Sequence, residues 1–164
     1  MNIIDIKDID FVNYKKPSMY IIMPYCSFKC DYECGREVCQ NSPLVYAKIH
    51  DINIDDIINQ YDSNPVSEAI VFGGLEPFDS SDFQAFIANF RYAHSDPIVI
   101  YTGYTKEEIQ EWESWIFNYE NIIIKFGRFI PDQESHYDSV LGVTLASPNQ
   151  YAEEFNFENS TQSR

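Results

Sequence analysis

Four cysteines are the residues best suited to chemistry in this sequence, because all of them fall within fourteen residues. They are Cys26, Cys30, Cys34 and Cys39, and the rest of the 164-residue chain contains no cysteine. A reducing compartment keeps thiols free, so grouped thiols there indicate a metal site rather than disulfides. The group therefore predicts a bound metal ion or an iron–sulfur cluster.

The spacing of the cysteines bears on which metal is bound. Structural zinc sites usually combine two C-x2-C pairs a dozen or more residues apart. Here Cys26 and Cys30 form a C-x3-C pair, and no distant second pair follows. Three thiolates from one loop can hold three corners of a [4Fe–4S] cube and leave the fourth iron open. The spacing favours this open centre, and structural zinc remains the alternative.

The elements that must position the thiols alternate between strand and helix. Helical spacing or capping signals predict helices over residues 53–61, 81–93 and 105–115, the last with a Thr105–Glu108 capping box. Apolar runs predict strands over residues 18–24, 69–72, 98–101, 121–126 and 142–146. This alternation is typical of an α/β fold with a mostly parallel sheet, which binds ligands at the carboxyl ends of its strands.

Composition bounds the organisation of the chain. Apolar residues make up 45% of it and aromatic residues 16%, enough for one folded domain, expected over residues 1–152 with a flexible tail over 153–164. No apolar run is long enough to span a bilayer, and the first residues lack the pattern of a secretory signal. We therefore expect a soluble, cytoplasmic protein.

The charge is unevenly distributed along the chain. The net charge is −15, yet residues 1–50 hold six basic and six acidic side chains, and residues 51–164 carry the whole excess. A surface that binds nucleic acid would show a stripe of Lys and Arg, and none is present in the sequence. Nucleic acid and anionic membranes are therefore not expected as partners.

Several motifs in order resemble the radical S-adenosylmethionine (SAM) superfamily, and within it the activating proteins of anaerobic (class III) ribonucleotide reductase. The resemblance covers about residues 10–150. Cys26–Cys30 matches the first half of the C-x3-C-x2-C cluster motif, and residues 39–41 resemble the C-x-N that follows. Residues 73–77 are similar to the GGEP motif, residues 101–104 to a YTGY segment and residues 147–150 to a terminal S-x-N-Q.

The resemblance leaves two candidates for the third cluster ligand, because eight residues separate Cys30 from Cys39 where the family has two. The family places an apolar residue before its third cysteine, against the adenine. Val38 fits that role before Cys39, whereas Glu33 precedes Cys34 and would be costly to bury. The resemblance therefore implies Cys26, Cys30 and Cys39 as ligands, with Cys34 as the alternative.

The same resemblance implies a SAM site beside the cluster. Glycines allow backbone carbonyls to approach the amino group of a ligand, which a Cβ would obstruct. Leu75 splits the glycine pair from Glu76 and Pro77, a departure from the family pattern. The residues implied in SAM binding are Gly73, Gly74, Glu76, Pro77, Val38 and Tyr101.

The function implied by the resemblance is glycyl-radical activation on a minimal, partial radical-SAM (βα) barrel. A [4Fe–4S] cluster would cleave SAM reductively, and the 5′-deoxyadenosyl radical would take a hydrogen atom from a glycine of the reductase large subunit. An electron donor is the second implied partner, and no catalytic side chain beyond the cluster is implied. The alternatives are another small radical-SAM enzyme acting on a small molecule, and a non-catalytic iron–sulfur or zinc module.

Overall fold

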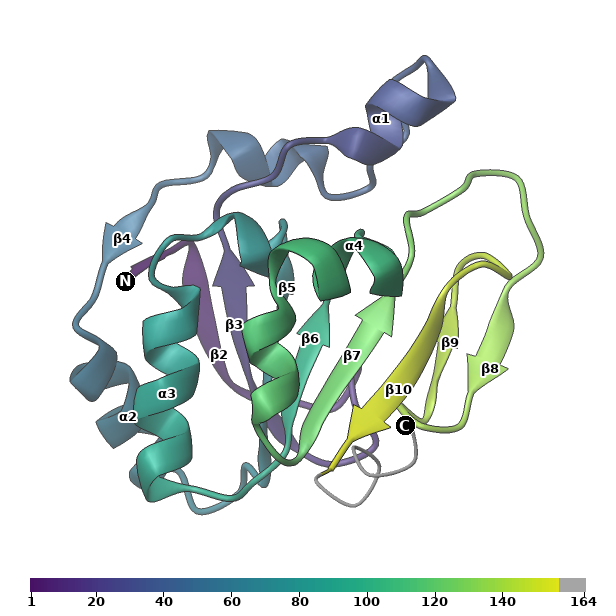
Figure 1. The fold of residues 1–164 in the computed structure, drawn as a ribbon. Helices are drawn as coiled ribbons and strands as arrows, with labels where there is room; N and C mark the ends of the chain where they lie inside the picture. The colour runs from purple at the N-terminus through teal and green to yellow at the C-terminus, as the bar shows by residue number, and fades with distance from the viewer. Residues whose placement is uncertain (157–164) are drawn as a thin grey trace.

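A six-stranded mixed sheet organises the chain in the computed structural model, which describes residues 1–156 (Figure 1). The strand order is β10-β7-β6-β5-β3-β2. The four central strands are parallel to one another, and the two edge strands run antiparallel to their neighbours. The strands are β2 (Asp5–Asp10), β3 (Ser18–Met23), β5 (Ala69–Gly74), β6 (Ile98–Tyr101), β7 (Ile122–Phe126) and β10 (Tyr151–Phe155).

This topology confirms the predicted mixed α/β domain with a mostly parallel sheet. The sheet has β2 and β10 at its two edges in the described residues. No barrel is shown by this order, and the partial (βα) barrel stays a prediction.

Short elements complete the fold. Two further strand pairs join β1 (Asn2–Ile3) to β4 (His50–Asp51) and β8 (His136–Asp138) to β9 (Val143–Leu145). The α-helices are α1 (Lys29–Cys34), α2 (Ile54–Asp62), α3 (Phe83–Ala93) and α4 (Lys106–Trp112). Three short 3-10 helices are η1 (Ser42–Tyr46), η2 (Pro77–Asp79) and η3 (Ser114–Asn118).

The helices form where the sequence supplies caps and an apolar face. The side chain of Asn53 accepts a hydrogen bond from the Asp55 N–H at the start of α2. Both bonds of the predicted capping box are present in α4, between Thr105 and Glu108. The buried side chains of α3 are all apolar, and they pack onto the sheet: Phe83, Phe86, Ile87 and Phe90.

The two faces of the sheet bury different kinds of side chain. Alternation in β7 sends Ile122, Ile124 and Phe126 to the face covered by α2 and α3, where they join a large core of Phe and Ile (Figure 1). Ile123 belongs to the opposite face, which is smaller and packs against Tyr14 and residues around the β8–β9 hairpin. This second face leads into the cavity described below.

The domain boundary differs from the one expected. Strand β10 extends to Phe155, because residues 151–155 pair with all five residues of β7. Residues 153–155, expected to begin a tail, are therefore part of the sheet, and the expectation for residues 157–164 lies outside the described residues. Within residues 1–156, the helices are too short or too polar to cross a membrane.

Candidate iron–sulfur centre

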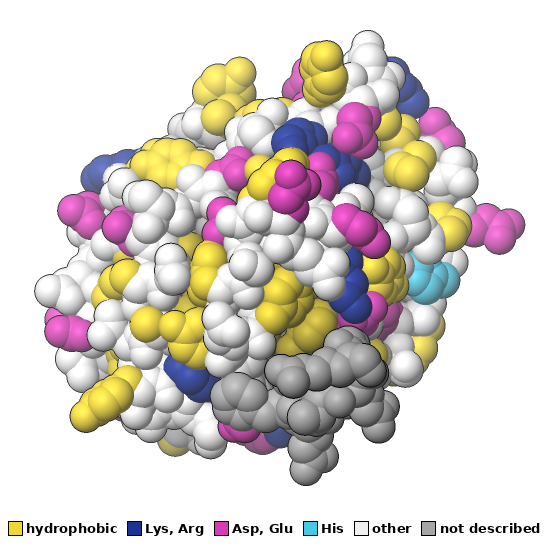
Figure 2. Space-filling model, viewed as in Figure 1, with side chains coloured by type: hydrophobic (Ala, Val, Ile, Leu, Met, Phe, Trp, Pro, Cys, Tyr) yellow, Lys and Arg dark blue, Asp and Glu magenta, His cyan; other side chains and the backbone are white. Residues whose placement is uncertain are grey.

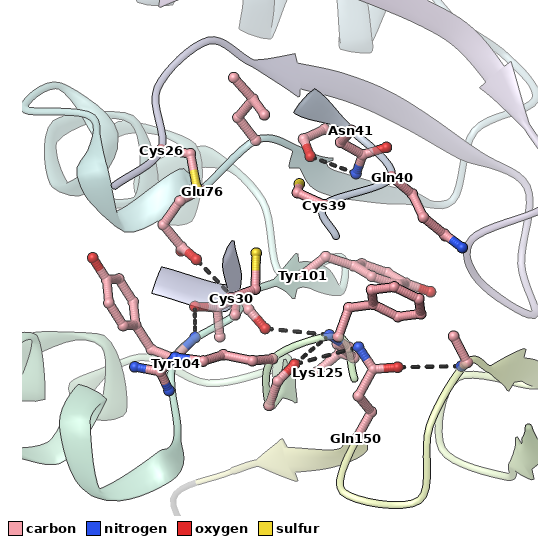
Figure 3. Close-up of a pocket in the computed structure, with 18 of the residues that line it drawn as sticks. Cys26, Cys30, Cys39, Gln40, Asn41, Glu76, Tyr101, Tyr104, Lys125 and Gln150 are labelled. Carbon is pink, nitrogen blue, oxygen red and sulfur yellow. Dashed lines mark hydrogen bonds between the residues drawn. The ribbon is translucent and has the colours of Figure 1, made fainter. Parts of the chain in front are cut away.

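A cavity of about 370 Å³ opens at the carboxyl ends of the parallel strands (Figure 3). Residues 24–49, here called the cysteine segment, border it on one side, and they stand above the ends of the strands in Figure 1. Six of the sequence-predicted site residues line the cavity: Cys26, Cys30, Cys39, Gly74, Glu76 and Tyr101. The other four lie outside its lining: Cys34, Val38, Gly73 and Pro77.

Three thiols from different parts of the cysteine segment line this cavity. Cys26 lies in the loop after β3, Cys30 lies on α1, and Cys39 lies in the loop before η1. Their sulfur atoms are turned toward a common space in Figure 3. Phe28, in a left-handed conformation with φ 52°, donates its N–H to Cys26 Sγ at 3.2 Å.

Burial lowers the acidity of two of these thiols. Burial raises the pKa of Cys26 to about 11. Burial also raises the pKa of Cys30 to about 12, with further contributions from Cys39 and Asp31. A bound metal reverses this preference, because its positive charge deprotonates a coordinating thiol. The thiols of Cys26 and Cys30 are therefore protonated in the metal-free chain, and a bound metal centre would deprotonate them.

Asp31 explains how Cys39 reaches the other two thiols across eight intervening residues. Its Oδ1 accepts hydrogen bonds from the N–H of Val38 at 2.7 Å and of Cys39 at 2.8 Å. Between these points the chain makes α1, turns at Gly35 with φ 65°, and returns. The long spacing is thus accommodated as a closed loop, and Cys39 lies beside Cys30.

Cys34 points elsewhere. It is exposed, whereas the other three cysteines are partly buried. It lines a neighbouring groove together with Glu33, Ile130 and Cys30, and Cys30 also lines the main cavity. Cys34 is thus absent from the lining of the cavity that Cys26, Cys30 and Cys39 share.

The glycine pair is required by close packing at the end of β5. Gly74 has φ 85°, and a Cβ there would lie 2.6 Å from Ile22 Cγ2. A Cβ on Gly73 would lie 2.8 Å from the Tyr20 hydroxyl oxygen. The Asn41 side chain donates to the Gly74 carbonyl at 2.7 Å, so the C-x-N motif ties the cysteine segment to β5.

The inserted Leu75 leaves the loop pairing intact. Its N–H donates to the Met23 carbonyl at 3.1 Å, and the Glu76 N–H donates to the Tyr25 carbonyl at 2.7 Å. The side chain of Leu75 is buried. The chain after β5 therefore continues alongside the chain after β3 up to the first cysteine.

Glu76 joins two of the loops. Its Oε2 accepts from the Gly103 N–H at 2.8 Å, and its Oε1 accepts from the Phe78 N–H at 3.2 Å. Burial raises the pKa of the Glu76 carboxyl to about 7, although these hydrogen bonds act in the opposite direction. The side chain therefore holds the loop at 74–76 against the loop at 102–104.

A family model described as a 4Fe-4S single cluster domain matches residues 18–147. The chain belongs to this family. The matched range runs from β3 through β9 and includes the whole cysteine segment. No curated protein and no solved structure matches the chain.

The donor set of this 4Fe-4S single cluster domain fits its cofactor. Three thiols, Cys26, Cys30 and Cys39, line one cavity, and thiolates are the usual ligands of iron–sulfur clusters. The same cavity is also lined by Gly74, Glu76 and Tyr101. A [4Fe–4S] cluster is accordingly the cofactor that the family supports.

Lys125 is a residue of the site that the sequence analysis did not select. Its side chain lines the cavity, is buried, and donates to the carbonyls of Gly127 at 2.8 Å and Thr102 at 3.3 Å. Burial lowers the pKa of Lys125 to about 8, and the neighbouring Glu76 carboxylate opposes this shift. Its position two residues after Ile123 in an apolar strand was the available signal, because alternation places both on the cavity face.

A polar network clamps α1 to the body of the domain. The Lys29 ammonium lies 4.2 Å from the centre of the Trp112 ring, 4.7 Å from that of Tyr104 and 3.4 Å from Glu108 Oε1. Arg128 forms two hydrogen bonds with Glu108, at 2.7 and 2.9 Å, and its Nε lies 3.0 Å from Glu33. Burial raises the pKa of Glu108, but the hydrogen bonds from Arg128 prevail and lower it to about 2.

Proposed function

We propose that this 4Fe-4S single cluster domain is a radical-SAM activating enzyme that generates the glycyl radical of an anaerobic ribonucleotide reductase. One observation carries the proposal: Cys26, Cys30 and Cys39 share a cavity, and Cys34 lies outside it. Three ligands leave a [4Fe–4S] cluster with one iron free to bind a further molecule, which is what separates a catalytic centre from a closed structural one.

The positions of the remaining motifs support the finer assignment. Residues 101–104, which resemble the YTGY segment of reductase-activating proteins, all line the cavity. Gln150, the last residue of the S-x-N-Q motif, lines it as well and donates to the Gly127 carbonyl at 3.3 Å. These motifs are distant in sequence and gather around the same volume as the three thiols.

In this proposal, the chain binds the cluster, orients SAM beside it and shields the site from water. Cys26, Cys30 and Cys39 bind the cluster, and Asp31 positions Cys39 through its backbone N–H. A bound, reduced cluster would supply the electron for cleavage of SAM to methionine and a 5′-deoxyadenosyl radical, and that radical would take a hydrogen atom from a glycine Cα of the reductase. Gly74 and Glu76 form the wall that receives SAM, and Lys125 places a positive charge at the cavity face.

The size of the cavity agrees with these roles. A volume of about 370 Å³ lies within the range of roughly 300–1,000 Å³ typical of small-molecule sites. Its wall combines apolar and aromatic side chains with a few buried polar groups, among them Glu76 and Lys125. That combination suits a ligand with a ring system at one end and charged groups at the other.

The proposal is tested under strict exclusion of oxygen, with the chain reconstituted with iron and sulfide. After reduction by dithionite, we expect 5′-deoxyadenosine from SAM, and a glycyl radical doublet in the electron paramagnetic resonance (EPR) spectrum once the reductase is added. Cys30→Ala abolishes both signals, whereas Cys34→Ala, the matched control, retains them. A cluster-loaded protein that forms no 5′-deoxyadenosine would contradict the proposal, and turnover of a small molecule without the reductase would support the alternative radical-SAM function.

A further inference from the structure

One side chain, that of Tyr104, contacts both ends of the short turn between Cys26 and Cys30. Tyr104 lines the cavity (Figure 3). Its hydroxyl lies beside Ser27, and its ring lies beside Lys29. Ser27 directly follows the first thiol, and Lys29 directly precedes the second. The contacts of Tyr104 therefore bracket the turn that separates these two thiols.

At the first thiol, the contact runs through a carboxylate. Asp79, on η2, accepts one hydrogen bond from the Tyr104 hydroxyl at 2.5 Å and another from the Ser27 N–H at 2.7 Å. The hydroxyl oxygens of Ser27 and Tyr104 lie 3.4 Å apart. Burial raises the pKa of Tyr104, and the bond to Asp79 raises it further, so the hydroxyl remains a donor. The backbone of Ser27 is therefore tied to Tyr104 through Asp79, and its side chain contacts Tyr104 directly.

At the second thiol, a cation lies against two aromatic rings. The Lys29 ammonium is 4.7 Å from the centre of the Tyr104 ring and 4.2 Å from that of Trp112. The two rings meet edge to face, with their centres 5.8 Å apart and their planes at 88°. Figure 2 shows charged side chains of both signs beside hydrophobic ones in the region that Figure 1 places between α1 and α4. Because a cation is attracted to the face of an aromatic ring, Tyr104 and Trp112 together hold Lys29 in place.

Between the two contacts, the backbone of Phe28 is strained. Phe28 has φ 52° and ψ 39°, in the left-handed region that a residue with a Cβ adopts only at a cost in free energy. Such a conformation persists only where the surrounding structure enforces it. Phe28 is the residue before α1, so its conformation sets the direction in which the chain enters the helix that carries Cys30. Tyr104 holds the residues on both sides of Phe28 and so supplies this enforcement.

We propose that Tyr104 is a positioning residue for the iron–sulfur cluster. By holding the residues on both sides of Phe28, it keeps Phe28 left-handed and thereby sets the separation of the Cys26 and Cys30 thiols. This inference goes beyond the proposed function and rests only on its assignment of these two cysteines as cluster ligands. It requires neither SAM cleavage nor the reductase.

Two variants of Tyr104 and a matched control test the proposal. Tyr104→Phe removes only the hydroxyl, and Tyr104→Leu removes the ring as well. The control is Tyr119→Leu, because Tyr119 is also partly buried and meets Trp115 edge to face, with ring centres 6.3 Å apart. Hydrogen exchange of the amides of residues 27–32 is measured in the metal-free chain. In the reconstituted chain, the rate of iron loss to a chelator and the EPR g values of the reduced cluster are measured.

We expect Tyr104→Leu to accelerate both the exchange of these amides and the loss of iron at least about tenfold. Tyr104→Phe, which keeps the ring, should show a smaller acceleration and g values that differ from those of the wild type. Tyr119→Leu should match the wild type in all three measurements. Unchanged exchange in Tyr104→Leu, or an equal acceleration in Tyr119→Leu, would overturn the proposal.

A second-site change separates positioning from general packing. Glycine adopts the left-handed conformation without strain, so Phe28→Gly removes the need for Tyr104 to hold it. The acceleration caused by Tyr104→Leu should therefore be several-fold smaller in the Phe28→Gly background, the coupling expected of residues that act on one another. An acceleration of the same size in both backgrounds would show that Tyr104 only packs, and would overturn the proposal. A loaded wild type that cleaves no SAM would instead refute the proposed function, and these measurements would still decide the role of Tyr104.

Discussion

The cysteine segment and the sheet beneath it are held together by different forces. In the sheet, β5, β6 and β7 bury nearly every side chain, and α3 adds four apolar residues to the same core. In the cysteine segment, α1 and η1 bury none. The segment is fixed by hydrogen bonds and ion pairs, chiefly through Asp31, Asn41 and Lys29.

This difference separates folding from cofactor binding. Burial of apolar surface is the dominant favourable term in folding, and the sheet supplies it without the cysteine segment. Net contributions from exposed polar contacts are small, so the segment depends on its hydrogen bonds and on the cluster for its order. We expect the metal-free chain to keep its sheet, with the cysteine segment as its least stable part.

The largest effect should come from the core of the sheet. Phe86 is fully buried and packs against Phe72 and Phe90. Phe86→Ala should lower the free energy of unfolding by about 3–5 kcal/mol through lost burial and a cavity. Urea unfolding measures this loss, and the iron content of the molecules that remain folded should equal that of the wild type. Tyr92→Ala, on the exposed side of the same helix, should change stability little; an equal loss there would contradict the comparison.

The next effect is a pH dependence that originates in Glu76. In the folded chain the Glu76 carboxyl keeps its proton up to about pH 7. In the unfolded chain the same carboxyl loses its proton near its ordinary pKa of 4.5. Protonated Glu76 therefore adds about 3 kcal/mol to the free energy of unfolding below pH 4.5, and this stabilisation is lost as the pH rises to about 7. Urea unfolding of the metal-free chain at pH 5 and pH 7.5 should show this fall relative to Glu76→Gln. Parallel pH profiles of the two proteins would show that Glu76 is ionised without cost.

A smaller effect, confined to the cysteine segment, should follow from Asp31→Ala. The change leaves the N–H groups of Val38 and Cys39 without their acceptor, a cost of about 1–3 kcal/mol. Hydrogen exchange should accelerate in residues 30–41, and bound iron should decrease, with global unfolding unchanged. Asp31→Asn, which keeps one acceptor oxygen, should retain more iron. If Asp31→Ala lowered the free energy of unfolding as much as Phe86→Ala, the cysteine segment and the sheet would unfold as one cooperative unit, which contradicts the comparison.

The smallest effect should come from Cys34→Ala. Because Cys34 is exposed and lies outside the cavity, its removal should leave the iron and sulfide content and the free energy of unfolding unchanged. Cys39→Ala should lose the cluster under the same conditions while keeping the stability of the sheet. Loss of the cluster in Cys34→Ala would exchange the roles of the two cysteines.

The central sheet could be predicted from the sequence because its signals are local. The apolar runs 69–72, 98–101 and 121–126 coincide with β5, β6 and β7 within two residues, since buried parallel strands have continuous apolar sequences. The edge strands β2 and β10 were missed because they are antiparallel and rich in charge, as in Asp5–Asp10. Their place in the sheet is decided by pairing with β3 and β7, which no local pattern encodes.

The cavity shows the same limit. The cysteines, the glycine-rich loop and the 101–104 segment were conspicuous in the sequence, and six of the ten site residues selected there line the cavity. Asp31 and the Glu108–Arg128 pair were missed, because each acts through a backbone N–H or through a partner distant in sequence. Lys125 was missed although its place in an apolar strand was a signal, because its partner Thr102 is distant in sequence. Charged residues of this kind look like ordinary surface residues until the fold shows what they contact.

The central claim is that Cys26, Cys30 and Cys39 hold a [4Fe–4S] cluster with one iron open to the cavity. Anaerobic reconstitution with counted iron and sulfide, followed by EPR of the reduced protein before and after addition of SAM, tests it most directly. The account predicts four iron and four sulfide per chain, and a spectrum that changes when SAM binds the open iron. Uptake of a single zinc per chain, or a cluster spectrum that SAM leaves unaltered, would contradict it.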